Sequence, residues 1–216
     1  LKIKPPQDIK LDIFLDKESL DWADAFLKEY NLKGVKPLIA IAPCGGASWG
    51  KQAYLKYWPV ENYIELTKRL LNRYNTEIIL FADEEEKRIV DEIEKAVIKG
   101  AVNLAGKLSL IQYLSLLSKL DILITNDSGN VHMANALGIK TASIFGPVDE
   151  KVYGPYPVNQ NHRVIKKDLA CRPCYRKFRI SDCQYDLRCL KTIEVEEVYL
   201  AVISLLSFTN QVEPEM

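Results

Sequence analysis

The chain has 216 residues, enough to bury the core of one large α/β domain or of one domain with appendages. Hydrophobic residues make up 48% and charged residues 27%, an ordinary composition for a soluble protein. Lys and Arg number 29, as do Asp and Glu, so the net charge attracts neither nucleic acid nor an anionic membrane. No apolar run approaches the roughly 18 residues of a transmembrane helix, and no secretory signal pattern is visible. We therefore expect a cytoplasmic protein, in which any attraction for an anionic ligand comes from local groups and not from the net charge.

The first part of the chain has the pattern of an interdomain linker followed by a helix. Residues 16–31 carry apolar side chains at helical spacing up to Gly34, and residues 2–10 contain two adjacent prolines, as linkers often do. We predict an interdomain linker and helix over residues 1–34, and a main domain over residues 35–216 that ends in a cysteine-rich segment.

Short apolar runs alternate with helical patterns along the main domain, as in a parallel sheet that is covered by helices on both faces. We predict strands at residues 38–42, 77–82, 102–104, 121–125, 141–145 and 163–165. We predict helices at residues 60–74, 84–98 and 109–119, from Asp127 to Gly138, and at residues 194–207. This order predicts an α/β fold with a Rossmann-like, doubly wound parallel sheet, in which ligands bind beyond the carboxyl ends of the strands.

The most informative segment follows the fourth predicted strand and reads Asp127-Ser128-Gly129-Asn130-Val131-His132. A strand that turns into a helix presents unpaired backbone N–H groups and the positive end of the helix dipole, which together bind anions. Ser128 and His132 are four residues apart and share one face of that helix. We expect Ser128, Gly129 and His132 to hold a pyrophosphate, although His132 could instead be a hydrogen-bonded core residue. We expect Asp127 to cap the helix and reach sugar hydroxyls, because a carboxylate repels phosphate.

The loop after the first predicted strand is rich in glycine and carries Ser48 and, before a Trp-Pro pair, Lys56. Glycines let backbone amides approach a phosphate, a hydroxyl donates to it and a lysine neutralises its charge. The residue order matches neither a P-loop nor a dinucleotide fingerprint. From spacing alone, a phosphate-binding loop and a mobile surface loop with a solvated lysine both stay open.

Four acidic residues at positions 83–86 open the helix after the second predicted strand. Acidic residues in a first turn usually complement the helix dipole. In nucleotide-binding folds, however, an acidic residue past the second strand binds the ribose hydroxyls. Glu86 is our candidate for that role, and we expect the other three to serve the helix.

Four of the five cysteines cluster late in the chain, as Cys171, Cys174, Cys183 and Cys189. Two pairs spaced in this way could hold a tetrahedral zinc ion, but the second pair is wider than the usual knuckle. We rank zinc below one or two disulfides or unbonded thiols in a packed loop. We expect a structural role, because the segment lies far from the anion-binding loops in the sequence and brings no acid–base partner.

Three motifs, Lys56-Tyr-Trp58-Pro59, Asp127-Ser-Gly-x-x-His132 and Phe145-Gly-Pro147, occur in this order, and the Cys-x-x-Cys segment follows them. Together they resemble glycosyltransferase family nine, the ADP-heptose:lipopolysaccharide heptosyltransferases. The resemblance covers roughly residues 38–206.

The resemblance implies the C-terminal, donor-binding half of a GT-B glycosyltransferase, in which two Rossmann-like domains face each other across a cleft. It implies an inverting, metal-independent enzyme without a cofactor. Such enzymes move heptose from ADP-heptose to inner-core lipopolysaccharide at the cytoplasmic face of the inner membrane. By position, the resemblance assigns donor-binding roles to Ser48, Lys56, Glu86, Leu108, Asp127, Ser128, Gly129 and His132. Leu108 matches the region near the adenine, Glu86 the ribose-binding acid, and Lys56, Asp127 and His132 the groups that act on the reacting phosphate and sugar.

The resemblance implies a catalytic base that is an aspartate of the N-terminal acceptor domain, and nothing in residues 1–34 resembles the glycine-rich loop that opens that domain. We therefore expect this chain to bind the nucleotide sugar without transferring it, to meet the acceptor only through the other domain, and to be peripheral to the membrane at most. Two other functions fit the residues. One is a GT-B domain for another nucleotide sugar, as in a UDP-sugar transferase or an epimerase, and the other is a non-catalytic nucleotide-binding or zinc-stabilised module.

Overall fold

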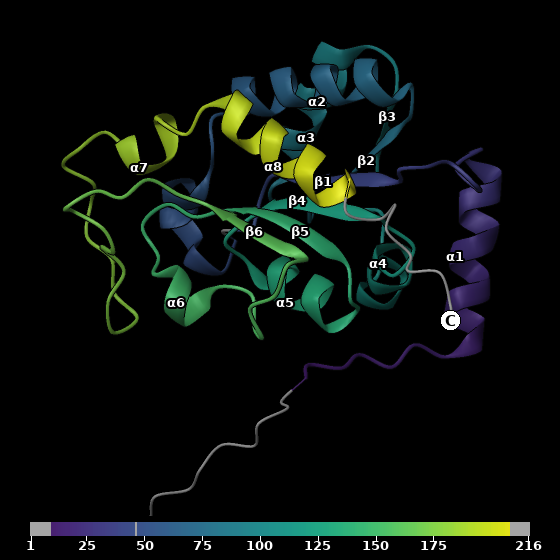
Figure 1. Ribbon diagram of the computed structural model, residues 1–216, viewed down its shortest axis with the longest axis horizontal. Helices are drawn as coiled ribbons and strands as arrows, with labels where there is room; N and C mark the ends of the chain where they lie inside the picture. Colours follow the sequence, from purple (N-terminus) through teal and green to yellow (C-terminus); the bar gives the residue numbers. More distant parts are fainter. Residues whose placement is uncertain (1–9, 46, 208–216) are drawn as a thin grey trace, which may run out of the picture.

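The computed structural model describes residues 10–45 and 47–207, apart from the side chains of Ala47 and Ser48. Six strands form one sheet in the order β3-β2-β1-β4-β5-β6 (Figure 1). All neighbouring strands are parallel, so their carboxyl ends lie at one edge, and the direction of winding reverses between β1 and β4. The strands are β1 (Ile39–Ala42), β2 (Ile78–Leu80), β3 (Ala101–Asn103), β4 (Ile122–Asn126), β5 (Lys140–Ile144) and β6 (His162–Ile165).

Helices cover both faces of the sheet (Figure 1). Successive strand residues point to opposite faces, so Ile39 and Ile41 of β1 join one apolar core while Ala40 and Ala42 join the other. The first core is closed by α2 (Val60–Tyr74), α3 (Lys87–Val97) and α8 (Val195–Ser207). The second is closed by α1 (Lys17–Glu29), α4 (Leu110–Leu117) and α5 (Gly129–Ala136).

The predicted strands and longer helices are confirmed, with small shifts at their ends. Ser109 caps α4 in a reciprocal capping box with Gln112, as its place before an apolar run indicated. The helix α3 begins later than predicted, at Lys87, because residues 84–86 form a turn. No helix in the described part of the chain is both long and apolar enough to cross a membrane.

Three short helices lie in segments that we expected to be loops. The largest is the 3-10 helix η1 (Ala47–Lys56), which is kinked at Gly50, where φ is 55°. The others are α6 (Glu150–Tyr153) and α7 (Arg188–Lys191). A 3-10 turn has neither the alternation of a strand nor the periodicity of a long helix, so residue patterns did not show it.

The predicted connecting helix, α1, packs against α4 and places Ala23 and Leu27 in the second core. Asp16 caps it by accepting from the N–H of Ser19 at 2.8 Å. The proline-containing stretch before it lies, up to residue 9, outside the described residues. The domain boundary after residue 34 therefore stays a prediction.

One histidine is held neutral inside the sheet region. His162 at the start of β6 is 7% exposed, and its Nδ1 lies 2.8 Å from the Thr141 hydroxyl. Its Nε2 lies 3.0 Å from the side-chain amide of Asn135, which satisfies its own partners when its oxygen faces the ring. This arrangement puts the proton on Nε2, and burial lowers the pKa of His162.

We predict that His162 makes the protein less stable at mildly acidic pH. Because its pKa is lower in the folded chain, the unfolded chain binds the proton more readily, near an unfolded pKa of about 6.5. The contribution of His162 is complete above that pH and is lost as the pH falls through the folded pKa. In urea titrations, the free energy of unfolding should fall more steeply from about pH 7 to about pH 5 in the native protein than in His162→Gln. Parallel pH profiles would contradict this.

Candidate functional site

Three loops meet at the carboxyl edge of the sheet, beyond β1, β2 and β4. The N–H of Gly45, after β1, donates to Oε2 of Glu86, after β2, at 2.9 Å. A Cβ atom on Gly45 would lie 2.2 Å from Cβ of Ser128, after β4, and φ of Gly45 is 122°. Only glycine fits there, on both grounds. The loops are thus in direct contact at the point where the winding of the sheet reverses, where ligands bind in such folds.

Asn126, the last residue of β4, connects the loop after β1 with the helix α2 beneath this edge. It is fully buried, its Nδ2 donates to the carbonyl of Pro43 at 2.9 Å, and its Oδ1 accepts from the hydroxyl of Tyr63 on α2. A buried amide with both ends bonded fixes the groups around it. Sequence reasoning did not single out Asn126, although a polar residue that ends a continuous apolar strand was a usable signal.

The helix α5 begins at Gly129, and its N-cap is Ser128, whose Oγ accepts from the N–H of Asn130 at 3.3 Å. Our prediction that Asp127 caps this helix is wrong. Asp127 precedes the cap by one residue, and its side chain turns instead toward Lys56. The sequence offered two adjacent cap-forming residues, and the tertiary partner decided between them.

Lys56, the last residue of η1, and Asp127 form a buried ion pair. Their side chains are 8% and 10% exposed, and Nζ lies 3.0 Å from Oδ2. Nζ also lies 4.5 Å from the centre of the Trp49 ring, a cation–π contact. Burial raises the pKa of Asp127, while the charges of Lys56 and His132 oppose that rise. Within the described part of the chain, Oδ2 has no hydrogen bond of good geometry, so this oxygen keeps the capacity to accept one.

The structure therefore brings together the three residues that the sequence suggested for the reacting groups. Lys56 contacts Asp127 directly, and His132, half-buried in the first turn of α5, lies close enough for its charge to oppose the burial-driven rise in the pKa of Asp127. Their assignment to a donor substrate stays a prediction, as does that of Ser48. The backbone of Ser48 lies in η1, and its side chain lies outside the described residues.

Glu86 is buried and links two loops. Its Oε1 accepts from the hydroxyl of Tyr57, next to Lys56, and its Oε2 accepts from Gly45. Burial and, after it, the hydrogen bond to Glu86 raise the pKa of Tyr57, so the phenol stays a donor. The carboxylate of Asp83 accepts from the N–H of Glu86 at 2.9 Å. This is a local role at the start of the helix, as we expected for the three acidic residues other than Glu86. Glu86 thus helps to position the segment that carries Lys56.

A cavity of about 410 Å³ opens beside these loops. Four predicted residues line it, namely Glu86, Leu108, Ser128 and Gly129. Sequence reasoning missed its aromatic wall, where Phe81 and Tyr113 meet edge to face at 4.9 Å and the Tyr113 hydroxyl donates to Asn130 at 2.9 Å. A cavity with an aromatic wall and acidic residues in its lining suits a nucleoside. Lys56, Asp127 and His132 are not on its walls, so the ion pair and the cavity are neighbouring parts of one edge.

The cysteine-rich segment lies against this site, although it is distant in the sequence. The Tyr175 ring stacks on Trp49, at 4.7 Å between centres, and Trp49 is the ring over which Lys56 lies. Distance in the sequence, from which we argued a structural role, therefore does not separate this segment from the anion-binding loops in space. Burial raises the pKa of Cys174, and that of Cys189 to about 11, which makes both poor nucleophiles. All five cysteines are unbonded thiols, and no described group of three His, Cys, Asp or Glu side chains is already arranged around one metal position.

Residues 4–184 match the family model described as glycosyltransferase family 9 (heptosyltransferase). The chain belongs to this family. It is 31% identical over 170 residues to lipooligosaccharide heptosyltransferase 2 of Campylobacter jejuni, covering 76% of this chain and 51% of that protein. It is 32% identical over 142 residues to lipopolysaccharide heptosyltransferase 2 of Salmonella typhimurium, covering 64% and 38%. The chain thus spans about half the length of the curated relatives that it matches.

Solved structures confirm the fold class. The chain superposes on E. coli ADP-heptose lps heptosyltransferase II with a TM-score of 0.73 at 22% identity, covering 95% of this chain and 56% of that one. It superposes on the glycosyl transferase family 9 protein of Veillonella parvula with a TM-score of 0.78 at 20% identity, covering 96% and 57%. The sheet and its helices thus have the Rossmann-like α/β fold of these structures, and the chain spans just over half of each of them.

We predict that Gly45→Ala disrupts the site and lowers stability by about 2 kcal/mol or more, because the methyl group meets Ser128 and the residue is held at positive φ. Gly34→Ala is the matched control, since Gly34 also has positive φ, 83°, but has no neighbour within 4 Å of its added Cβ. Urea unfolding measures both variants. Equal losses of stability would show that backbone strain, not the contact with Ser128, requires glycine at position 45.

Proposed function

We propose that this chain is the donor-binding half of a heptosyltransferase that moves heptose from ADP-heptose to the inner core of lipopolysaccharide. The observation that carries the proposal is the buried Lys56, held by Asp127 at the carboxyl edge of the sheet beside the amino end of α5. A cation and a helix amino terminus at one place favour a diphosphate. Family membership supports the reaction class.

The diphosphate has to be stabilised most strongly as it leaves. When the bond between the sugar and the diphosphate breaks, negative charge grows on the phosphate oxygens. In this proposal Lys56, His132 and the backbone amides of Ser128 and Gly129 bind the charge of the transition state more tightly than that of the ground state. Because these groups are already in position, they stabilise the leaving group without a metal ion.

The contacts with the rest of the nucleotide sugar are assigned from Oδ2 of Asp127 and from the residues that line the cavity. Oδ2 of Asp127, which is paired with Lys56 but can still accept a hydrogen bond, accepts one from a hydroxyl of the donor sugar. Glu86 and Leu108 both line the cavity. In this proposal Glu86 accepts from a ribose hydroxyl, and Leu108 contacts the adenine. Ser48 completes the phosphate loop as a hydroxyl donor.

The acceptor side belongs to the rest of the enzyme. In this proposal the catalytic base is an aspartate of an acceptor domain that residues 1–34 do not supply, and that domain carries the lipopolysaccharide core. Without it, water is not excluded and the acceptor hydroxyl is not deprotonated. We therefore infer that this chain binds ADP-heptose but transfers no sugar by itself, and that the complete enzyme works at the cytoplasmic face of the inner membrane.

We predict that Lys56→Ala weakens ADP binding about 10- to 100-fold, the loss expected for a charged hydrogen bond of about 1.5–3 kcal/mol. Lys51→Ala is the matched control, because Lys51 is an exposed lysine of the same 3-10 helix. Isothermal titration calorimetry measures both, and urea unfolding confirms that the variants are folded. If the two variants bind ADP alike, Lys56 does not bind the diphosphate.

The same titration with UDP tests whether the nucleotide of the donor substrate is ADP, as proposed, or UDP. The diphosphate is shared, so only the base differs, and the apolar cavity with its aromatic wall should favour the larger adenine. Tighter binding of UDP would point to another nucleotide-sugar enzyme. If the chain binds neither nucleotide, the remaining alternative is a non-catalytic, zinc-stabilised module.

A further inference from the structure

Four cysteines surround a second cavity, which lies outside the donor site. Its volume is about 350 Å³, and its walls include Cys171, Cys174, Cys183 and Cys189. Cys189 is buried in α7, Cys171 and Cys174 are half-buried, and Cys183 is exposed. The first two come from a Cys-x-x-Cys pair and the others from two further points of the chain, so folding itself gathers the four sulfurs around one space.

The segment that carries these cysteines has little structure of its own. Between β6 and α7, the described residues 166–187 contain only turns and one isolated bridge, between Arg176 and Arg179. In Figure 1 it is the loop that extends away from the sheet between β6 and α7. Such long irregular stretches are uncommon in a compact domain and are usually functional or held by something other than a core.

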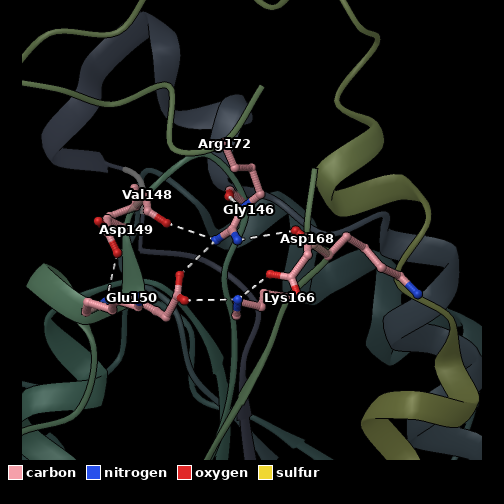
Figure 2. Close-up of polar contacts among 9 residues, drawn as sticks. Gly146, Val148, Asp149, Glu150, Lys166, Asp168 and Arg172 are labelled. Atoms are coloured by element: carbon pink, nitrogen blue, oxygen red, sulfur yellow. Dashed lines mark hydrogen bonds and ion pairs between the residues drawn. The ribbon is translucent and has the colours of Figure 1, made fainter. Parts of the chain in front are cut away.

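Both ends of the segment are held by contacts with the rest of the domain. Figure 2 shows the Arg172 side chain inserted among the carbonyls of Gly146 and Val148 and the carboxylate of Glu150. Its side chain is only 6% exposed, and the bond to Val148 is 3.0 Å long. At the other end, Cys189 belongs to the first core.

The backbone around the cavity favours a negatively charged sulfur. The N–H groups of Tyr185 and Leu187 point at Sγ of Cys183, at 3.4 and 3.3 Å. N–H groups that face a thiolate stabilise its charge, as they do around metal-bound cysteines. Arg176 and Arg188 also line the cavity. A divalent ion with four thiolates carries a net charge of about minus two, which two guanidinium groups would balance.

We propose that Cys171, Cys174, Cys183 and Cys189 form a tetrathiolate site for a single soft divalent metal, with Zn²⁺ as the representative ion. The cysteines do not yet converge on one point, so the ion draws in the middle of the segment and the four thiols release their protons as it binds. The site is structural, because four sulfurs leave a tetrahedral ion no open position.

Metal binding would act on the neighbouring loop through Tyr175. Its N–H and that of Cys174 both donate to the carbonyl of Pro147, at 3.1 and 2.9 Å, and its ring stacks on Trp49. Ordering the cysteines therefore holds Tyr175 against the 3-10 helix that ends at Lys56. The metal proposal itself does not depend on which nucleotide the donor site binds.

The test is to purify the full 216-residue chain under reducing, oxygen-free conditions and measure metal content, for both zinc and iron, before and after exposure to Zn²⁺. We expect one ion per chain. Cys183→Ser and Cys189→Ser should each lose most of the bound metal. Cys44→Ser should keep it, because Cys44 is the fifth cysteine and lines the other cavity.

Two measurements on the unaltered protein keep the result decisive even if a variant fails to fold. Co²⁺ should give the visible bands of a tetrahedral thiolate complex, and Zn²⁺ should abolish them. In hydrogen exchange, Zn²⁺ should slow residues 170–187 selectively. The proposal is overturned if the reduced chain binds no metal, if Cys44→Ser loses as much metal as the others, or if thiol counting after purification shows that these four cysteines pair as disulfides.

Discussion

The buried pair of Lys56 and Asp127 sets the chemistry of the whole carboxyl edge. Removing two charges from water is costly, and this cost offsets much of their attraction, so the pair adds little net stability. A lone carboxylate would repel a phosphate group by about 4 kcal/mol at roughly 4 Å in a medium of intermediate dielectric. With Nζ 3.0 Å away, that repulsion is largely cancelled. In the proposed donor complex, the same pair would let Asp127 face the sugar while its neighbours hold the diphosphate.

The rest of the domain supports the position of Lys56 from several directions. Glu86 bonds Tyr57, the next residue in the chain, and Asn126 fastens the start of the loop after β1. On the outer side, Trp49 lies between Lys56 and Tyr175. The cysteine-rich segment is therefore part of the support of the site, and a metal bound there would make that support rigid.

The fold followed from the sequence where local pattern and tertiary environment agree. Strands buried on both faces, such as β4, are continuous apolar runs, and Ser109 signals a helix start by itself. The site was less predictable. Ser128 and Asp127 can each cap a helix, and only a partner from a distant loop decided between them. The contact of Tyr175 with Trp49 joins two irregular segments, so no periodic pattern could reveal it.

The most direct test of the central claim is a crystal structure of this chain with ADP bound. The account predicts phosphate oxygens about 3 Å from Nζ of Lys56 and from the backbone amides at the start of α5, with the base in the cavity lined by Phe81 and Tyr113. ADP bound elsewhere, or bound with its phosphates turned away from Lys56 and α5, would contradict it.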